Sequence, residues 1–313
     1  MDIIQVITRE LNVEKWQVEA AVKLIDEGCT IPFISRYRKE ATGTLNDEQL
    51  RNLNERLTYL RNLEDKKAQV LGSIEEQGKL TPELKKQIEA AQTLVVVEDL
   101  YRPYRPKRRT RAIIAREKGL GPLADIILLQ MTKKPLEEEA ISGARDIIAE
   151  HISDEADYRI SIRKRTMDKG TICSTARDEK EQSVYEMYYD FEEPVKKLAG
   201  HRVLALNRGE KEKFLTVKIL APEEEIIRYL EKQVIVRDNP YTTPVLKEAI
   251  EDSYKRLIGP AIEREIRSAL TEAAEDGAIH VFGKNLEQLL MQPPIAGQVV
   301  LGWDPAFRTG CKL

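Results

Sequence analysis

The sequence predicts a mainly α-helical protein with one small β element. Lys, Glu, Leu and Ala are frequent, whereas the 313 residues include only 16 glycines and 14 prolines, and this composition favours helices. Apolar residues recur at steps of three and four over long stretches, which is the spacing of one helix face. Aromatic residues make up only 6% of the chain. The core must therefore rest on aliphatic side chains.

Three short helices are expected to open the chain, over residues 2–10, 13–27 and 31–38. Gly28 would end the second helix, and Pro32 falls in the first turn of the third, where proline is tolerated. Short helices joined by tight turns can form a helix-turn-helix that reads DNA. They can equally form the corner of a small bundle, and the sequence leaves both readings open.

A long packing helix follows, starting at Asn46 or Asp47 and running to about Gln77. Its apolar residues keep three- and four-residue steps: Leu50, Leu53, Leu57, Leu60, Leu63, Val70 and Leu71. The next helix begins at Thr81 and Pro82, with the threonine as cap and the proline just inside.

Helices are expected to continue to about Lys197, with some irregularity at residues 170–174. Residues 202–206 and 214–220 then alternate apolar and polar side chains, which is the pattern of half-buried strands. Gly209 lies in the segment between them. This pattern predicts a β-hairpin near residues 201–220.

Helices resume after Pro222, and the segment VVLGWD at residues 299–304 then predicts a buried strand with Asp304 at its end. A turn and the start of a return strand would reach Leu313. A lone strand and part of its partner cannot bury themselves. We therefore expect the chain to be a fragment of a longer protein, cut within a β-hairpin.

The clearest chemical signal is a basic strip, residues 101–116, which holds seven cations and no acid: Arg102, Arg105, Lys107, Arg108, Arg109, Arg111 and Arg116. Tyrosines alternate with the first arginines, and two prolines hold the segment extended. Guanidinium groups bind phosphate bidentately and stack on bases, so the strip could follow a nucleic-acid backbone. It could also pair internally, because the chain has 53 acidic residues.

A second basic cluster, RISIRKR, contains Arg159, Arg163, Lys164 and Arg165. Helical spacing would place several of these cations on one face. A solvated helix face is the expected reading, and a second nucleic-acid patch is the alternative.

Composition and motifs point away from enzymes and membranes. Phosphate-binding-loop, nucleophile-elbow and zinc-protease motifs are absent, and His151, His201 and His280 are isolated. The cysteines Cys29, Cys173 and Cys311 lack CxxC spacing, so we expect no disulfide framework, metal site or cofactor. The net charge of −3 limits nucleic-acid binding to local patches. The start of the chain lacks a signal-peptide pattern and no apolar run could span a bilayer, so a cytoplasmic protein is expected.

Six segments of the chain resemble the bacterial Tex family of transcription accessory proteins. They are GCTIPFISRYRKEATGTLND, EDLYRPYRPKRRTRAIIAREKGLGPLA, HRVLALNRGEKEKFL, LIGPAIEREIRSALTEAA, NLEQLLMQPP and VVLGWDPAFRTGCKL. The resemblance implies a helical N-terminal domain with a helix-turn-helix-like part at 1–197, a hairpin and helical region at 198–297, and the truncated start of a ribonuclease-H-like domain at 298–313.

The resemblance also implies a function, which is that of a scaffold in transcription that associates with nucleic acid. RNA or DNA would be contacted through its backbone, and weakly, because the family's C-terminal oligonucleotide-binding barrel is not in this chain. The transcription machinery is a further expected partner. Asp304 falls where related nucleases carry their first catalytic carboxylate. Two alternatives stay open: part of a metal-dependent nuclease, or a purely protein-binding helical scaffold.

Overall fold

The computed structural model describes residues 2–136, 138–293, 296–303 and 310. Within these residues the protein is mainly α-helical, with one three-stranded antiparallel sheet, which confirms the expected fold class. The chain forms two compact units, one of residues 1–168 and 221–262, the other of residues 169–220 and 263–313. The expected domain boundaries after residues 197 and 297 stay a prediction.

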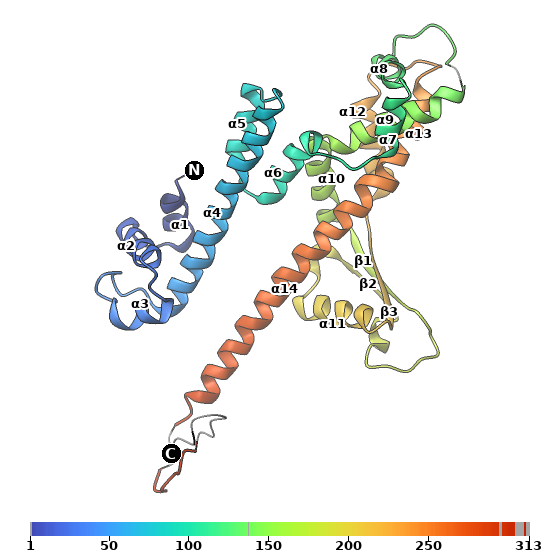
Figure 1. Ribbon diagram of the computed structural model, residues 1–313. Helices are drawn as coiled ribbons and strands as arrows, with labels where there is room; N and C mark the ends of the chain where they lie inside the picture. The colour runs from blue at the N-terminus through green and yellow to red at the C-terminus, as the bar shows by residue number, and fades with distance from the viewer. Residues whose placement is uncertain (1, 137, 294–295, 304–309, 311–313) are drawn as a thin grey trace. The chain divides into compact units, whose positions relative to one another are not determined.

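The first unit is built from helices throughout (Figure 1). Its elements are α1 (Ile3–Leu11), α2 (Lys15–Asp26), α3 (Ile31–Tyr37), α4 (Asp47–Glu76), α5 (Pro82–Ala90), α6 (Leu94–Tyr101), the 3₁₀ turn η1 (Arg102–Tyr104), α7 (Arg111–Glu117), α8 (Gly121–Leu129), α9 (Glu138–Asp154), α10 (Ala156–Lys169), α12 (Glu223–Val234), α13 (Thr243–Asp252) and the π-helical stretch η4 (Ser253–Ile258).

Helix α4 organises the N-terminal part of this unit. Asn46 caps it with a capping box: its side-chain oxygen accepts from the backbone N–H of Gln49 at 2.8 Å, and the side-chain oxygen of Gln49 accepts from the backbone N–H of Asn46 at 3.0 Å. The first half of α4 packs against α1, α2 and α3 through one apolar cluster, which includes Ile7, Val18 and Ile34. The second half packs against α5 and α6 through another cluster. The apolar steps in the sequence therefore predicted this helix and its buried face.

The second unit contains β1 (Thr171–Ala176), β2 (Asp190–Pro194), β3 (Leu215–Leu220), α11 (Gly200–Lys211), two 3₁₀ turns at Glu186–Tyr188 and Val195–Lys197, and α14 (Gly259–Leu290) from its second turn onward. The strand order is β2-β1-β3, and both pairs are antiparallel. Figure 1 shows the strands side by side, with α11 next to them. Helices α11 and α14 approach closely, since a Cβ on Gly200 would lie 3.3 Å from the Cα of Ala274.

The expected hairpin at 201–220 is wrong in its first strand. Residues 202–206 belong to α11, whose buried residues Val203, Leu206 and Gly209 recur at steps of three, so a helix buries them better than a strand would. The second strand is real, but β3 pairs with β1. Strand β1 covers the segment that the sequence predicted only as an irregular stretch of helix.

The expected buried strand at 299–304 is wrong where the structure describes it. Residues 299–303 have no regular secondary structure, and Val299, Leu301 and Trp303 are exposed. None of the three strands described in the structure pairs with this segment, and a strand without a partner leaves its backbone groups unpaired. Asp304 and most of the expected return strand lie outside the described residues.

Candidate nucleic-acid interface

The basic strip begins at the end of α6, runs through a bent connection and continues into α7, which carries Arg111 and Arg116. Helix α6 ends at Tyr101, η1 turns the chain, and residues 105–110 have no regular secondary structure. Thr110 caps α7, because its hydroxyl accepts from the Ile113 amide at 3.2 Å. The prolines of the strip and this cap keep the segment out of a continuous helix, so successive cations do not share one helical face.

Two cations of the strip are tied to acids of α9. The Arg102 Nε lies 3.4 Å from an Asp154 oxygen. The Lys107 ammonium lies 3.4 Å from Glu150 and also forms a close ion pair with Asp154. Burial raises the pKa of the Asp154 carboxyl, and the hydrogen bond from Lys107 opposes that rise. These two cations therefore fasten the strip to α9.

The tyrosines of the strip are anchors as well. The Tyr101 hydroxyl lies 2.9 Å from the Ser73 hydroxyl, and the Gln77 side chain donates to the Tyr104 carbonyl at 2.9 Å. Both rings pack against the apolar cluster of α4, α5 and α6. The two tyrosines therefore hold the strip against this cluster.

The other five cations of the strip are exposed: Arg105, Arg108, Arg109, Arg111 and Arg116. Arg105 lies 3.9 Å from Glu98, and Arg109 lies 2.9 Å from Glu117, both in solvent-exposed pairs. Such pairs contribute little to stability, so a phosphate can replace the carboxylate at small cost. Within the described residues, Arg108, Arg111 and Arg116 form no ion pair.

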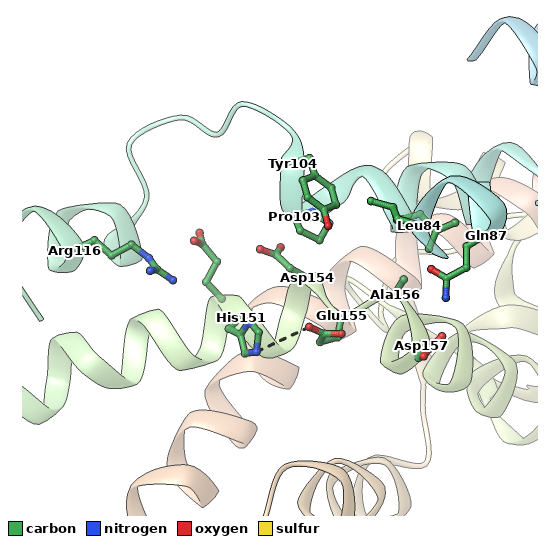
Figure 2. A pocket seen from close by; sticks show the side chains of 12 residues that line it. Leu84, Gln87, Pro103, Tyr104, Arg116, His151, Asp154, Glu155, Ala156 and Asp157 are labelled. Carbon is green, nitrogen blue, oxygen red and sulfur yellow. Dashed lines mark ion pairs between the residues drawn. The ribbon is translucent and has the colours of Figure 1, made fainter. Parts of the chain in front are cut away.

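A pocket of about 420 Å³ lies beside the strip, lined in part by Tyr104 and Arg116 (Figure 2). Its other polar walls are mostly acidic and include Glu150, Asp154, Glu155 and Asp157. This charge repels phosphate. The pocket therefore belongs to the internal side of the strip, and nucleic acid would have to meet the exposed arginines instead.

The second basic cluster is not a solvated face, which corrects the expectation. Arg159 is 1% exposed and its Nε donates to an Asp99 oxygen at 2.6 Å. Arg163 donates to the other Asp99 oxygen at 2.8 Å, and Arg165 pairs with Glu225. Only Lys164 of the four cations is exposed. Three of the four cations are therefore structural, because Asp99 on α6 pairs with Arg159 and Arg163 and Glu225 pairs with Arg165.

Sequence reasoning missed a second exposed basic surface, on α3. The segment PFISRYRK places aromatic and basic residues in alternation, and that signal was read only as a short helix. In the structure Phe33 and Tyr37 are exposed, and Arg38 lies over the Phe33 ring with its guanidinium carbon 5.8 Å from the ring centre.

Metal-binding groups do not assemble in the described part of the chain. No group of three or more His, Cys, Asp or Glu side chains there could hold a metal ion. Of the two free cysteines described, Cys173 has its thiol pKa raised to about 11 by burial and by its hydrogen bond to Glu192, which disfavours the reactive thiolate. None of the described helices combines the length and apolar character needed to cross a membrane.

Two family models match the chain. One, described as the Tex-like protein N-terminal domain, matches residues 1–75, and one described as Tex central region-like matches residues 130–282. The two matches include α1 to α4 in the first unit and all three strands of the second.

Relatives from bacteria and animals match nearly the whole chain. The Bacillus subtilis protein YdcI is 50% identical over 99% of this chain and 46% of its own length. The transcriptional accessory protein Tex of Neisseria gonorrhoeae is 38% identical over 100% of this chain and 44% of its own length. Human S1 RNA-binding domain-containing protein 1 is 30% identical over 100% of this chain and 34% of its own length. The chain thus spans less than half the length of these relatives.

Proposed function

The chain belongs to the Tex family, and from that premise we propose that it acts as a nucleic-acid-binding scaffold in transcription and not as an enzyme. The name of the Neisseria relative supports the link to transcription, and the name of the human relative supports RNA as a ligand. Because the chain spans less than half of each relative, contacts that the rest of those proteins make would add to its own.

The exposed arginines of the basic strip carry this proposal. Lys107 and Arg102 fix the strip on α9, while Arg105, Arg108 and Arg109 extend from an irregular segment into solvent. Arginine on a fixed irregular backbone suits phosphates, since the guanidinium fork bonds bidentately without reading a base. The proposed contact is therefore with the sugar-phosphate backbone of RNA or DNA.

A titration of the 313-residue chain with labelled RNA and DNA, followed by fluorescence anisotropy, tests the strip. Changing Arg105, Arg108 and Arg109 to Glu should weaken binding and reduce the slope of log K against log salt by about 2, because three phosphate contacts are lost. The matched control changes Lys79, Lys85 and Lys86 to Glu. These lysines are exposed and form no ion pair within the described residues, so the charge change is the same.

The result that overturns the proposal is an affinity and a salt slope equal to those of the unchanged chain, or an equal loss in the lysine control. A purely protein-binding scaffold is the second candidate, and the internal pairs of Arg102 and Lys107 favour it. It predicts that Arg102→Gln and Lys107→Gln, which break the internal pairs, lower the melting temperature, and that the variants of Arg105, Arg108 and Arg109 leave nucleic-acid affinity unaltered. Thermal melts of the Arg102 and Lys107 variants, together with the titrations of the exposed-arginine variants, separate the two candidates.

A further inference from the structure

The outer side of α3 is a second charged surface, separate from the basic strip. Thr30 precedes the helix and Pro32 lies in its first turn. Ile34 is fully buried in the N-terminal apolar cluster, and the Ser35 hydroxyl lies 3.3 Å from an Asp47 oxygen at the start of α4. These two residues fix the inner side of α3. We call the exposed residues on and after its outer side the α3 face: Phe33, Arg36, Tyr37, Arg38 and Lys39.

Two aromatic rings of the α3 face meet solvent. Phe33 is 39% exposed and Tyr37 is 71% exposed. Their ring centres lie 5.4 Å apart with the planes tilted by 44°, so the pair does not close into a parallel stack. Exposing these two neighbouring rings leaves apolar area in contact with water, and a ligand that covers them would remove that area from water with a gain in free energy. Arg38 lies over one side of the Phe33 ring, so the Tyr37 ring and the remaining surface of the Phe33 ring are what a planar ligand could cover without any unfolding of the helix.

The cations of the α3 face lack counterions. Arg36, Arg38 and Lys39 form no ion pair with any residue that the structure describes. The acidic residue next to them in sequence is Glu40, which directly follows Lys39. By contrast, Arg51, Arg56 and Arg61 on the neighbouring α4 each pair with a carboxylate. In a chain with more acids than bases, this local excess of positive charge favours an anionic ligand.

The segment after α3 is held in a fixed conformation. The Gln17 amide donates to the carbonyls of Thr42 and Gly43 at 3.3 and 2.9 Å. Gly43 adopts a φ of +61°, and a Cβ there would lie 2.4 Å from the indole of Trp16, so only glycine fits. The buried Thr42 hydroxyl bonds back to the carbonyl of Arg38. The backbone that carries Arg38 and Lys39 is therefore ordered before any ligand binds.

We propose that the α3 face is a binding site for single-stranded nucleic acid, with bases stacked on Phe33 and Tyr37 and phosphates on Arg36, Arg38 and Lys39. Stacking on exposed rings next to cations is how single strands are bound without sequence preference. A duplex keeps its bases paired and stacked, so it could use only the cations. The site uses different residues from the basic strip and does not depend on it.

The test measures binding of the 313-residue chain to 12-nucleotide oligo-U and oligo-dT, and to a duplex of the same length. Tyr37→Ala should weaken single-strand binding roughly 5- to 150-fold, the range for loss of one stacked base. Tyr37→Phe keeps the ring and should retain affinity. Phe33→Leu keeps apolar bulk without the ring and should also weaken binding. Ultraviolet crosslinking should join the oligonucleotide to the peptide that contains Tyr37.

Charge is tested separately from stacking. Changing Arg36, Arg38 and Lys39 to Gln should reduce the salt slope for single strands by about 2, whereas Lys79, Lys85 and Lys86 changed to Gln should leave it unaltered. Oligo-U and oligo-dT distinguish RNA from DNA as the source of the ligand.

Equal affinity of Tyr37→Ala and the unchanged chain would overturn the inference, as would duplex binding as tight as single-strand binding. If the α3 variants have no effect while the strip variants do, this inference fails and the proposed function stands. If only the α3 variants weaken binding, the nucleic-acid role of the strip is rejected and that of the α3 face is retained. Binding of a protein partner that depends on Tyr37 without any effect on oligonucleotides would assign the face to protein recognition instead.

Discussion

At the scale of single residues, Asp99 explains why a basic cluster disappears from the surface. Its carboxylate is 3% exposed and accepts from both Arg159 and Arg163. Removing charges from water is costly, and the cost is recovered only when each buried charge has close partners. One carboxylate with two guanidinium groups meets that condition. The ion pair joins α6 to α10 and so supports the basic strip, which leaves α6 at Tyr101.

Asp99→Ala should destabilise the chain by about 3–5 kcal/mol, because it leaves the buried Arg159 without its counterion. Urea denaturation followed by circular dichroism measures the loss. Asp125→Ala, which removes an exposed carboxylate, should change stability by less than about 0.5 kcal/mol. Adding Arg159→Met to Asp99→Ala should restore part of the stability, since the uncompensated buried charge is then gone. Equal effects of the Asp99 and Asp125 variants would contradict a structural ion pair.

At the scale of elements, the sequence predicted those that carry a regular signal and missed those that depend on distant partners. Helix α4 has an N-cap, a three- and four-residue apolar spacing and a glycine after its end, so its bounds were predictable. The run VLAL in α11 fits a helix and a strand equally well over four residues, and only packing on β3 decides. Strand β1 is nearly featureless in sequence, because its buried positions are Ile172 and Ser174.

The candidate interface shows the same division. The charge run located the basic strip correctly, since charge composition needs no tertiary information. Which cations face outward was not predictable, because Lys107 finds Glu150 and Asp154 more than forty positions along the chain. The α3 face was missed for the opposite reason: its signal is local, but exposure of Phe33 and Tyr37 depends on Ile34 taking the buried position.

Two arginine forks on α4 predict how the N-terminal helices respond to acid. Arg56 bonds both oxygens of Glu10 on α1, at 2.5 and 2.7 Å, and Arg61 bonds both oxygens of Asp26 on α2, at 2.7 and 2.9 Å. Each hydrogen-bonded arginine holds the pKa of its carboxyl below the ordinary value of 4.5 for Glu10 and 3.8 for Asp26. The forks therefore stabilise the fold above these ordinary values, and this contribution is lost as the pH falls below them.

Changing Arg56 and Arg61 to Gln should lower stability at pH 7 by about 0.5 kcal/mol for each exposed pair. The difference from the unchanged chain should shrink below about pH 4, because the carboxyls become protonated in both proteins. Thermal melts between pH 3 and pH 7 measure it. Arg51→Gln is the control, since its pair with Asp47 lies within α4 and joins no second helix. A difference that stays constant over this pH range would show that the forks do not act through their charges.

At the scale of the whole molecule, the net charge is slightly negative, so positive potential can arise only at local surface patches. The chain carries 53 acidic and 50 basic residues, and acids neutralise many of the basic groups. Arg108, Arg111 and Arg116 of the strip and the cations of the α3 face are among the exceptions within the described residues. Nucleic acid would therefore be attracted locally while most of the surface repels it, and binding should weaken steeply as salt rises.

For the whole chain, we expect no cleavage of nucleic acid. Hydrolysis of a phosphodiester by two metal ions needs several carboxylates that converge on sites about 4 Å apart, and the described residues bring no such group together. Asp304 is a single carboxylate outside the described residues. We therefore expect labelled RNA and DNA to stay intact when the chain is incubated with Mg²⁺ or Mn²⁺. Cleavage that Asp304→Asn abolishes, and that the exposed control Asp276→Asn retains, would instead establish a nuclease. Cleavage that survives Asp304→Asn would point to a contaminating enzyme, because the one carboxylate that motivates the idea would then be dispensable.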